Sequence, residues 1–127
     1  MLATGALVAT LTAGCSALSR ESPTLDLVLY NHVDTAYTVE MGLFRVDDGL
    51  SRSEARAYQR SIDLDPRGEV RLSDVADSRQ YLVEYEVYEN NDRRTDGGHV
   101  HYYPVDDDDG DRLTFDLRPP GTLTRRQ

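Results

Sequence analysis

The fold is decided by residues 81–88, Tyr81-Leu82-Val83-Glu84-Tyr85-Glu86-Val87-Tyr88. Apolar or aromatic side chains stand at every second position, and two glutamates stand between them. Because successive side chains of a strand point to opposite faces, this alternation is typical of a β-strand with one buried face. We therefore expect a strand here whose odd-numbered residues point inward.

The same alternation recurs along the chain, and turn-forming residues separate the runs. It predicts seven strands, at 25–30, 37–43, 58–64, 70–72, 81–88, 99–103 and 112–117. Short strands with frequent turns favour two packed sheets. The fold class expected for residues 24–118 is therefore all-β, an antiparallel β-sandwich of about seven strands. Residues 119–127 lack the pattern and are expected to form a flexible tail.

Two local motifs refine this expectation. Ser51-Arg52-Ser53-Glu54 fits a capping box that begins one helical turn. The run from Asp77 to Val83 resembles the tyrosine corner of immunoglobulin-like domains, which implies that the Tyr81 hydroxyl bonds to upstream backbone. The alternative is that Tyr81 is an ordinary half-buried aromatic residue of a strand.

The chain begins with an uncharged apolar run from Leu2 to Ala13, which is too short to span a bilayer. Leu11-Thr12-Ala13-Gly14-Cys15 resembles the lipobox of a lipoprotein signal peptide. It departs from that pattern in having Thr12 three residues before the cysteine, and no positive charge precedes the run. The resemblance implies a signal peptide at 1–14, lipid on Cys15, a tether at 15–23 and an extracellular, membrane-anchored domain. An ordinary secretory signal or a buried N-terminal strand remains as the alternative.

The composition is acidic and free of lysine. The chain has 23 acidic and 14 basic residues and a formal net charge of −9, and every basic residue is arginine. Such surfaces resemble those of salt-loving archaea, where salt screens self-repulsion. A GC-rich genome, which favours arginine codons, is the alternative. The acidity argues against nucleic-acid binding, because that function needs a basic face.

A broader resemblance covers most of residues 24–118. The segment from Leu64-Asp65-Pro66-Arg67-Gly68-Glu69 to Tyr81-Leu82-Val83-Glu84-Tyr85 looks like small haloarchaeal lipoproteins with immunoglobulin-like sandwiches. The resemblance implies a fold and a location, and no activity.

His99 and His101 are the best candidates for chemistry. They share one face of a strand, and Glu84 and Glu86 have the same outward parity on the preceding strand. Imidazoles with a carboxylate can bind zinc or copper. Exposed histidines facing glutamates across a hairpin are the alternative. A blue-copper site is excluded, since it needs a core thiolate and the only cysteine is Cys15.

Residues 106–111, Asp106-Asp107-Asp108-Asp109-Gly110-Asp111, invite a calcium-binding interpretation, because carboxylate oxygens suit that ion. The EF-hand pattern does not fit, since it would put Val105 at the first ligand position. A solvated acidic hairpin tip is the alternative.

Sequence signatures of enzymes are absent: the chain has no Gly-x-Ser-x-Gly, no phosphate-binding glycine loop and no His-Glu-x-x-His. The function expected is a non-enzymatic binding or structural module without a cofactor, anchored at the cell surface beside an unknown protein partner. The alternative is a metal-binding accessory protein that uses His99 and His101.

The net charge generates a first prediction. If the acidic surface is adapted to brine, the melting temperature of the protein should rise as KCl or NaCl rises into the molar range, because salt screens self-repulsion. Thermal unfolding followed by circular dichroism measures this. A flat or falling melting temperature would remove the argument for a salt-loving source.

Overall fold

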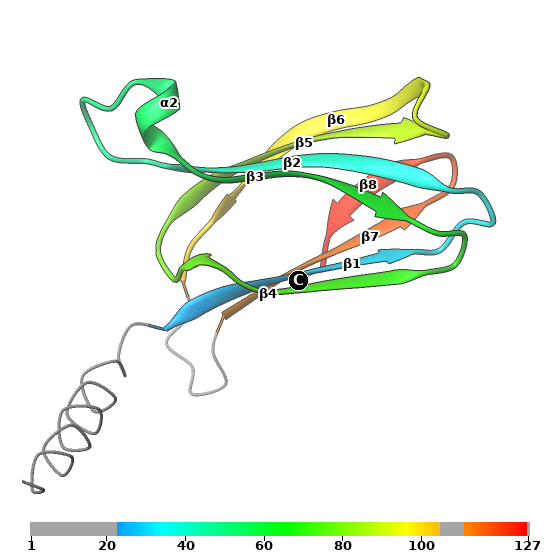
Figure 1. Ribbon diagram of the computed structural model, residues 1–127, viewed down its shortest axis with the longest axis horizontal. Helices are drawn as coiled ribbons and strands as arrows, with labels where there is room; N and C mark the ends of the chain where they lie inside the picture. The colour runs from blue at the N-terminus through cyan, green and yellow to red at the C-terminus, as the bar shows by residue number, and fades with distance from the viewer. Residues whose placement is uncertain (1–22, 105–110, 127) are drawn as a thin grey trace, which may run out of the picture.

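The computed structural model describes residues 23–104 and 111–126, which form two facing β-sheets (Figure 1). The all-β sandwich predicted from the alternation is therefore confirmed, with eight strands in place of about seven. The elements in chain order are β1 (Thr24–Asn31), β2 (Tyr37–Arg45), α2 (Arg52–Ala55), β3 (Arg56–Leu64), β4 (Glu69–Asp77), β5 (Tyr81–Glu89), β6 (Arg93–Tyr102), β7 (Asp111–Arg118) and β8 (Thr122–Arg125).

Each sheet has four strands. One has the order β4-β1-β7-β8, and the other has the order β3-β2-β5-β6. All neighbouring strands are antiparallel except β1 and β7, which run parallel. The part of the expected fold that the structure bears out is this two-layer β-sandwich. The strand order differs from that of a constant-type immunoglobulin domain, where the first two strands share a sheet, because here β1 and β2 belong to different sheets.

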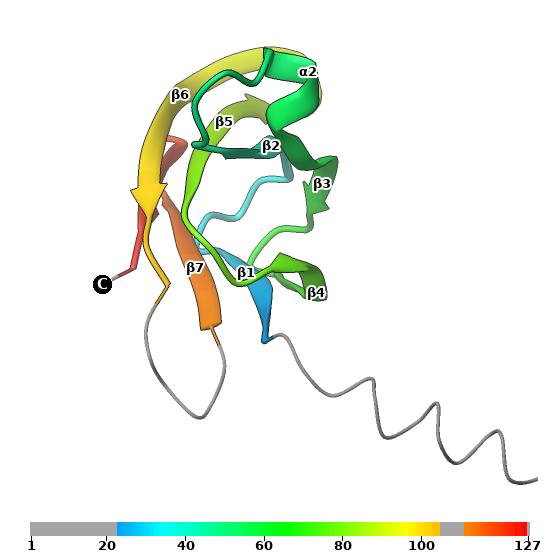
Figure 2. The same cartoon turned by 90° about the vertical axis from the view of Figure 1, so that its left-hand side faces the viewer.

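Figure 2 shows the two sheets facing each other. The core lies between them and is built from inward-pointing residues of both sheets. Leucines of β1 and β7 and the ring of Phe115 come from one sheet. Aliphatic residues of β2 and β5 come from the other. The most deeply buried members, each 0% exposed, are Leu25, Leu27, Leu29, Val39, Leu43, Val83, Val87, Leu113, Phe115 and Leu117. The apolar half of the alternation seen in the sequence thus forms the core between the two sheets.

The C-terminal segment differs from the expected flexible tail. Residues 122–125 form β8, which pairs with β7 from Phe115 to Arg118. The Leu123 side chain is only 2% exposed and packs in the core. Alternation cannot be recognised in this segment of the sequence, because the strand has four residues and Leu123 is its one buried residue.

The hairpin between β5 and β6 is also tighter than expected. The turn has Asn90 and Asn91 in the left-handed region, with φ of 53° and 64°, and the Asp92 amide donates to the Glu89 carbonyl at 3.0 Å. Two successive left-handed residues make a type I′ turn, which asparagine tolerates and which suits the twist of a hairpin. As a result β6 begins at Arg93, before the two glycines at 97 and 98.

Both local motifs have the geometry that the sequence led us to expect. Ser51 caps α2, with reciprocal hydrogen bonds between Ser51 and Glu54. The Tyr81 hydroxyl donates to the Asp77 carbonyl at 2.7 Å, and the Tyr81 side chain is 1% exposed. This is the bond to upstream backbone that defines a tyrosine corner.

Tyr81 and Tyr88 provide a matched test. Tyr81→Phe should lower the free energy of unfolding by about 0.5–1.5 kcal/mol, because the hydrogen bond from the buried Tyr81 side chain to the Asp77 carbonyl is lost. Tyr88→Phe should cost less, because the Tyr88 hydroxyl donates only to the exposed Glu86 carboxylate. Denaturant unfolding of both variants measures the difference. Equal losses at the two positions would argue against the corner.

Candidate functional site

The candidate site is the outer face of the sheet β3-β2-β5-β6. On β2, Val39, Met41 and Leu43 point into the core, so the residues between them point to solvent. On β5 the outward positions are taken by Glu84 and Glu86. The face is therefore built from the polar half of the alternation that buries the core.

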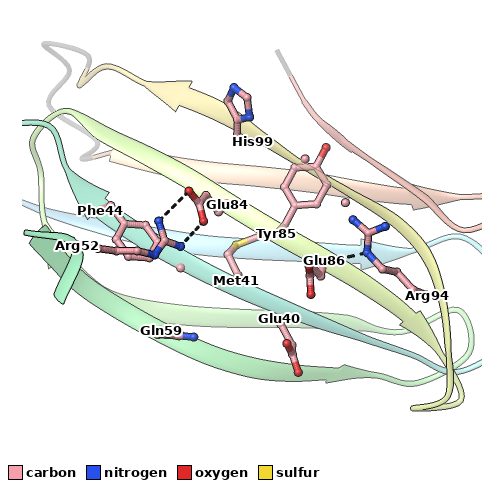
Figure 3. Close-up of a pocket in the computed structure, with 13 residues that line it drawn as sticks. Glu40, Met41, Phe44, Arg52, Gln59, Glu84, Tyr85, Glu86, Arg94 and His99 are labelled. Carbon is pink, nitrogen blue, oxygen red and sulfur yellow. Dashed lines mark hydrogen bonds and ion pairs between the residues drawn. The ribbon is translucent and has the colours of Figure 1, made fainter.

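This face carries an open groove of about 460 Å³ (Figure 3). Its lining comes from β2, β3, β5, β6 and α2, elements far apart in the sequence. The side chains that dominate it are Glu40, Phe44, Arg52, Glu84, Glu86 and Arg94. A groove with so many charged groups differs from the mainly apolar pockets that bind small molecules.

One side of the groove is closed by an ion pair. Arg52 donates through both terminal nitrogens to the Glu84 carboxylate, at 2.5 and 3.2 Å. Its guanidinium carbon also lies 4.2 Å from the centre of the Phe44 ring. The hydrogen bond from Arg52 holds the pKa of Glu84 below its ordinary value, and nearby His99 contributes in the same direction. The capped helix α2 positions Arg52, so Glu84 is already neutralised by the protein itself.

The other side is different, because two glutamates stand at opposed positions of neighbouring strands. Glu40 on β2 and Glu86 on β5 are direct partners in the strand register. Glu86 accepts a hydrogen bond from the Tyr88 hydroxyl at 2.7 Å, and the Arg94 Nε lies 3.8 Å away. Within residues 23–104 and 111–126, the Glu40 carboxylate makes no hydrogen bond or ion pair. The hydrogen bond to Glu86 raises the pKa of Tyr88, and the charges of Glu86 and Glu40 raise it further.

Glycines allow side chains to lie flat on this face. A Cβ atom at Gly97 would stand 2.0 Å from a terminal nitrogen of Arg94, and one at Gly42 would stand 2.9 Å from the Phe44 ring. The Arg94 guanidinium and the Phe44 ring therefore occupy the space that side chains at these positions would fill.

The four predicted metal ligands all lie on this outer face, as the alternation of side chains along the two strands predicts. They are His99, His101, Glu84 and Glu86. His99 is the register partner of Glu84, both histidines are exposed, and their rings meet edge to face at 5.7 Å. However, Glu84 is held by Arg52, and Glu86 is opposite Gly97 and not opposite a histidine. In the part of the chain that the structure describes, no three His, Cys, Asp or Glu side chains are grouped to hold a metal ion. Cys15 and the aspartates at 106–109 lie outside the described residues.

A second polar cluster, on the outer face of the other sheet, was not anticipated from the sequence. The Asp116 side chain of β7 is 7% exposed and contacts His32 Nε2 at 2.8 Å. Arg126 donates to both of its carboxylate oxygens, at 2.6 and 3.0 Å, and lies over the Tyr30 ring at 4.6 Å. These bonds, that from Arg126 first, lower the pKa of Asp116 to about 2. No sequence signal could reveal the cluster, because His32 and Asp116 are 84 residues apart.

Comparison of the chain with models of protein families, with curated proteins and with solved structures found no match. Over the described ranges, none of the helical structure is long and apolar enough to cross a membrane.

The Asp116 cluster predicts a pH-dependent contribution to stability. A pKa lowered from 3.8 to about 2 corresponds to about 2 kcal/mol in favour of the folded, ionised state. The contribution is fully present above pH 3.8 and is lost as the pH falls through about 2. Asp116→Asn should therefore be about 2 kcal/mol less stable than the wild type at pH 6 and should approach it near pH 2. Denaturant unfolding across this range measures the difference, and a gap independent of pH would contradict the assignment.

Proposed function

We propose that this protein is a non-enzymatic binding or structural module, held at the extracellular face of the cell membrane by a lipid on Cys15. The observation that carries the binding role is the charged groove on the outer face of β3-β2-β5-β6. Its lining is polar, open and partly uncompensated, which suits the surface of a polar partner better than a buried small molecule.

The N-terminal segment supports the location. The apolar run ends in Leu11-Thr12-Ala13-Gly14-Cys15, and Pro23 follows Cys15 by only eight residues. An extended chain of that length reaches at most about 28 Å. A lipid on Cys15 would therefore keep the sandwich close to the membrane surface.

The position of the first strand fits this arrangement. β1, which follows the proposed tether, belongs to the sheet opposite the groove (Figures 1 and 2). A partner in the groove would consequently approach a face that β1 does not occupy. The lysine-free, acidic composition supports a source among salt-loving archaea, where high salt keeps such a surface soluble.

Replacing the proposed lipidation residue tests the location. In a host that processes lipoproteins, the wild-type protein should partition with membranes and carry a lipid adduct detectable by mass spectrometry. Cys15→Ser should be released or left unprocessed, since serine has no thiol to receive the lipid. Ser16→Ala is the matched control and should behave as the wild type. Unchanged, detergent-dependent membrane association of Cys15→Ser would refute the anchor.

A further inference from the structure

We propose that the groove binds an extended, basic segment of a partner protein, with an arginine guanidinium of the partner seated between Glu40 and Glu86. The proposal rests on the binding role proposed above and names the chemistry of the partner. Its basis is the charge distribution of the groove: Glu84 is paired closely with Arg52, whereas Glu86 has only a long ion pair with Arg94 and Glu40 has none with the described residues.

The first step is the position of the two carboxylates. Glu40 and Glu86 are register partners on the two central strands of the sheet. Side chains at such positions have Cβ atoms about 4.5–5.5 Å apart, and like charges directly opposite each other are destabilising. A cation placed between them removes that repulsion and gains two charge-assisted contacts.

The second step is that none of the described residues places a cation in hydrogen-bonding contact with both Glu40 and Glu86. Arg52 is committed to Glu84, with contacts of 2.5 and 3.2 Å. Arg94 reaches only Glu86, at 3.8 Å, which is beyond hydrogen-bonding distance. Glu40 is left exposed, with no ion pair to any of the described residues. Figure 3 shows Glu40 and Glu86 on neighbouring strands, with Arg94 on the far side of Glu86.

The opposite sheet holds its most buried outward carboxylate differently. There, the carboxylate of Asp116 is compensated by both Arg126 and His32, at 2.6 and 2.8 Å. On the groove side, by contrast, Glu86 has only a long ion pair with Arg94, and Glu40 has no ion pair with any described residue. Both glutamates line the groove, which gives a partner side chain room to enter.

The third step concerns the shape of the ligand. The groove extends over four neighbouring strands and a helix rather than closing into a pocket, so an extended chain fits it better than a compact molecule. A guanidinium is favoured over an ammonium, because its planar set of donors can reach two carboxylates at once. The nearby Phe44 ring is only 6% exposed and already holds the guanidinium of Arg52 at 4.2 Å, so it leaves little aromatic surface for a partner.

The test uses the full-length protein in a non-ionic detergent and two peptides. Each has five residues with acetylated and amidated ends and a serine- and threonine-based sequence. One peptide has a central arginine, and the other has citrulline, which keeps the shape without the charge. Titrations are followed by ¹H–¹⁵N NMR at moderate salt. The arginine peptide should shift amide resonances of β2 and β5 around Glu40 and Glu86 saturably, whereas the citrulline peptide should not.

Variants separate the groove from general attraction to an acidic protein. Glu40→Gln/Glu86→Gln should weaken binding of the arginine peptide at least tenfold. Asp48→Asn/Asp92→Asn removes the same charge from two exposed turn residues outside the groove and should change the affinity less than twofold. Equal weakening by both double variants, shifts spread over the whole surface, or equal binding of the citrulline peptide would overturn the proposal. Membrane partition of Cys15→Ser is measured separately, so failure of the anchor and failure of the groove give different results.

Discussion

The register between β2 and β5 is the constraint on which the rest of the structure depends. It places Val39 opposite Val87 and Leu43 opposite Val83 in the core, and it places Glu40 opposite Glu86 on the outer face. A slip of one residue would exchange the two faces of a strand, burying glutamates and exposing valines. The core and the groove are therefore two sides of a single pairing. Hydrophobic burial fixes the register, and the carboxylates on the far side follow from it.

The distribution of charge shows how so acidic a chain forms a stable sandwich. Its most buried outward carboxylate, Asp116, has two basic partners, and Glu84 has Arg52. Arginines also occupy the edge strand β6, at Arg93 and Arg94, where charged side chains discourage pairing with another sheet. Against this background, Glu40 lies on an accessible face without an ion pair to any described residue, next to a Glu86 that Arg94 approaches only to 3.8 Å.

The proposed anchor and the proposed binding face belong to different layers of the molecule. The chain enters the sandwich through β1, in the sheet β4-β1-β7-β8, and the groove lies on the outside of the other sheet. Tethering and recognition would consequently not compete for the same surface. A short tether would limit the distance of the groove from the membrane without covering it, which is the geometry expected of a surface module that meets a partner at the cell envelope.

Local patterns in the sequence were sufficient for seven of the eight strands, the capped turn at Ser51 and the tyrosine corner at Tyr81, because each depends on neighbours a few residues away. Parity alone also placed Glu84, Glu86, His99 and His101 on one outward surface. Tertiary structure decided the rest: the parallel pairing of β1 with β7, the docking of β8 through Leu123, and the partners of each charge. Arg52 and Glu84 are 32 residues apart in the sequence, yet their side chains form an ion pair, which occupies the carboxylate that was predicted to bind a metal. Side-chain alternation is a local property of an extended backbone, whereas ion pairing depends on which strands the packed core brings together.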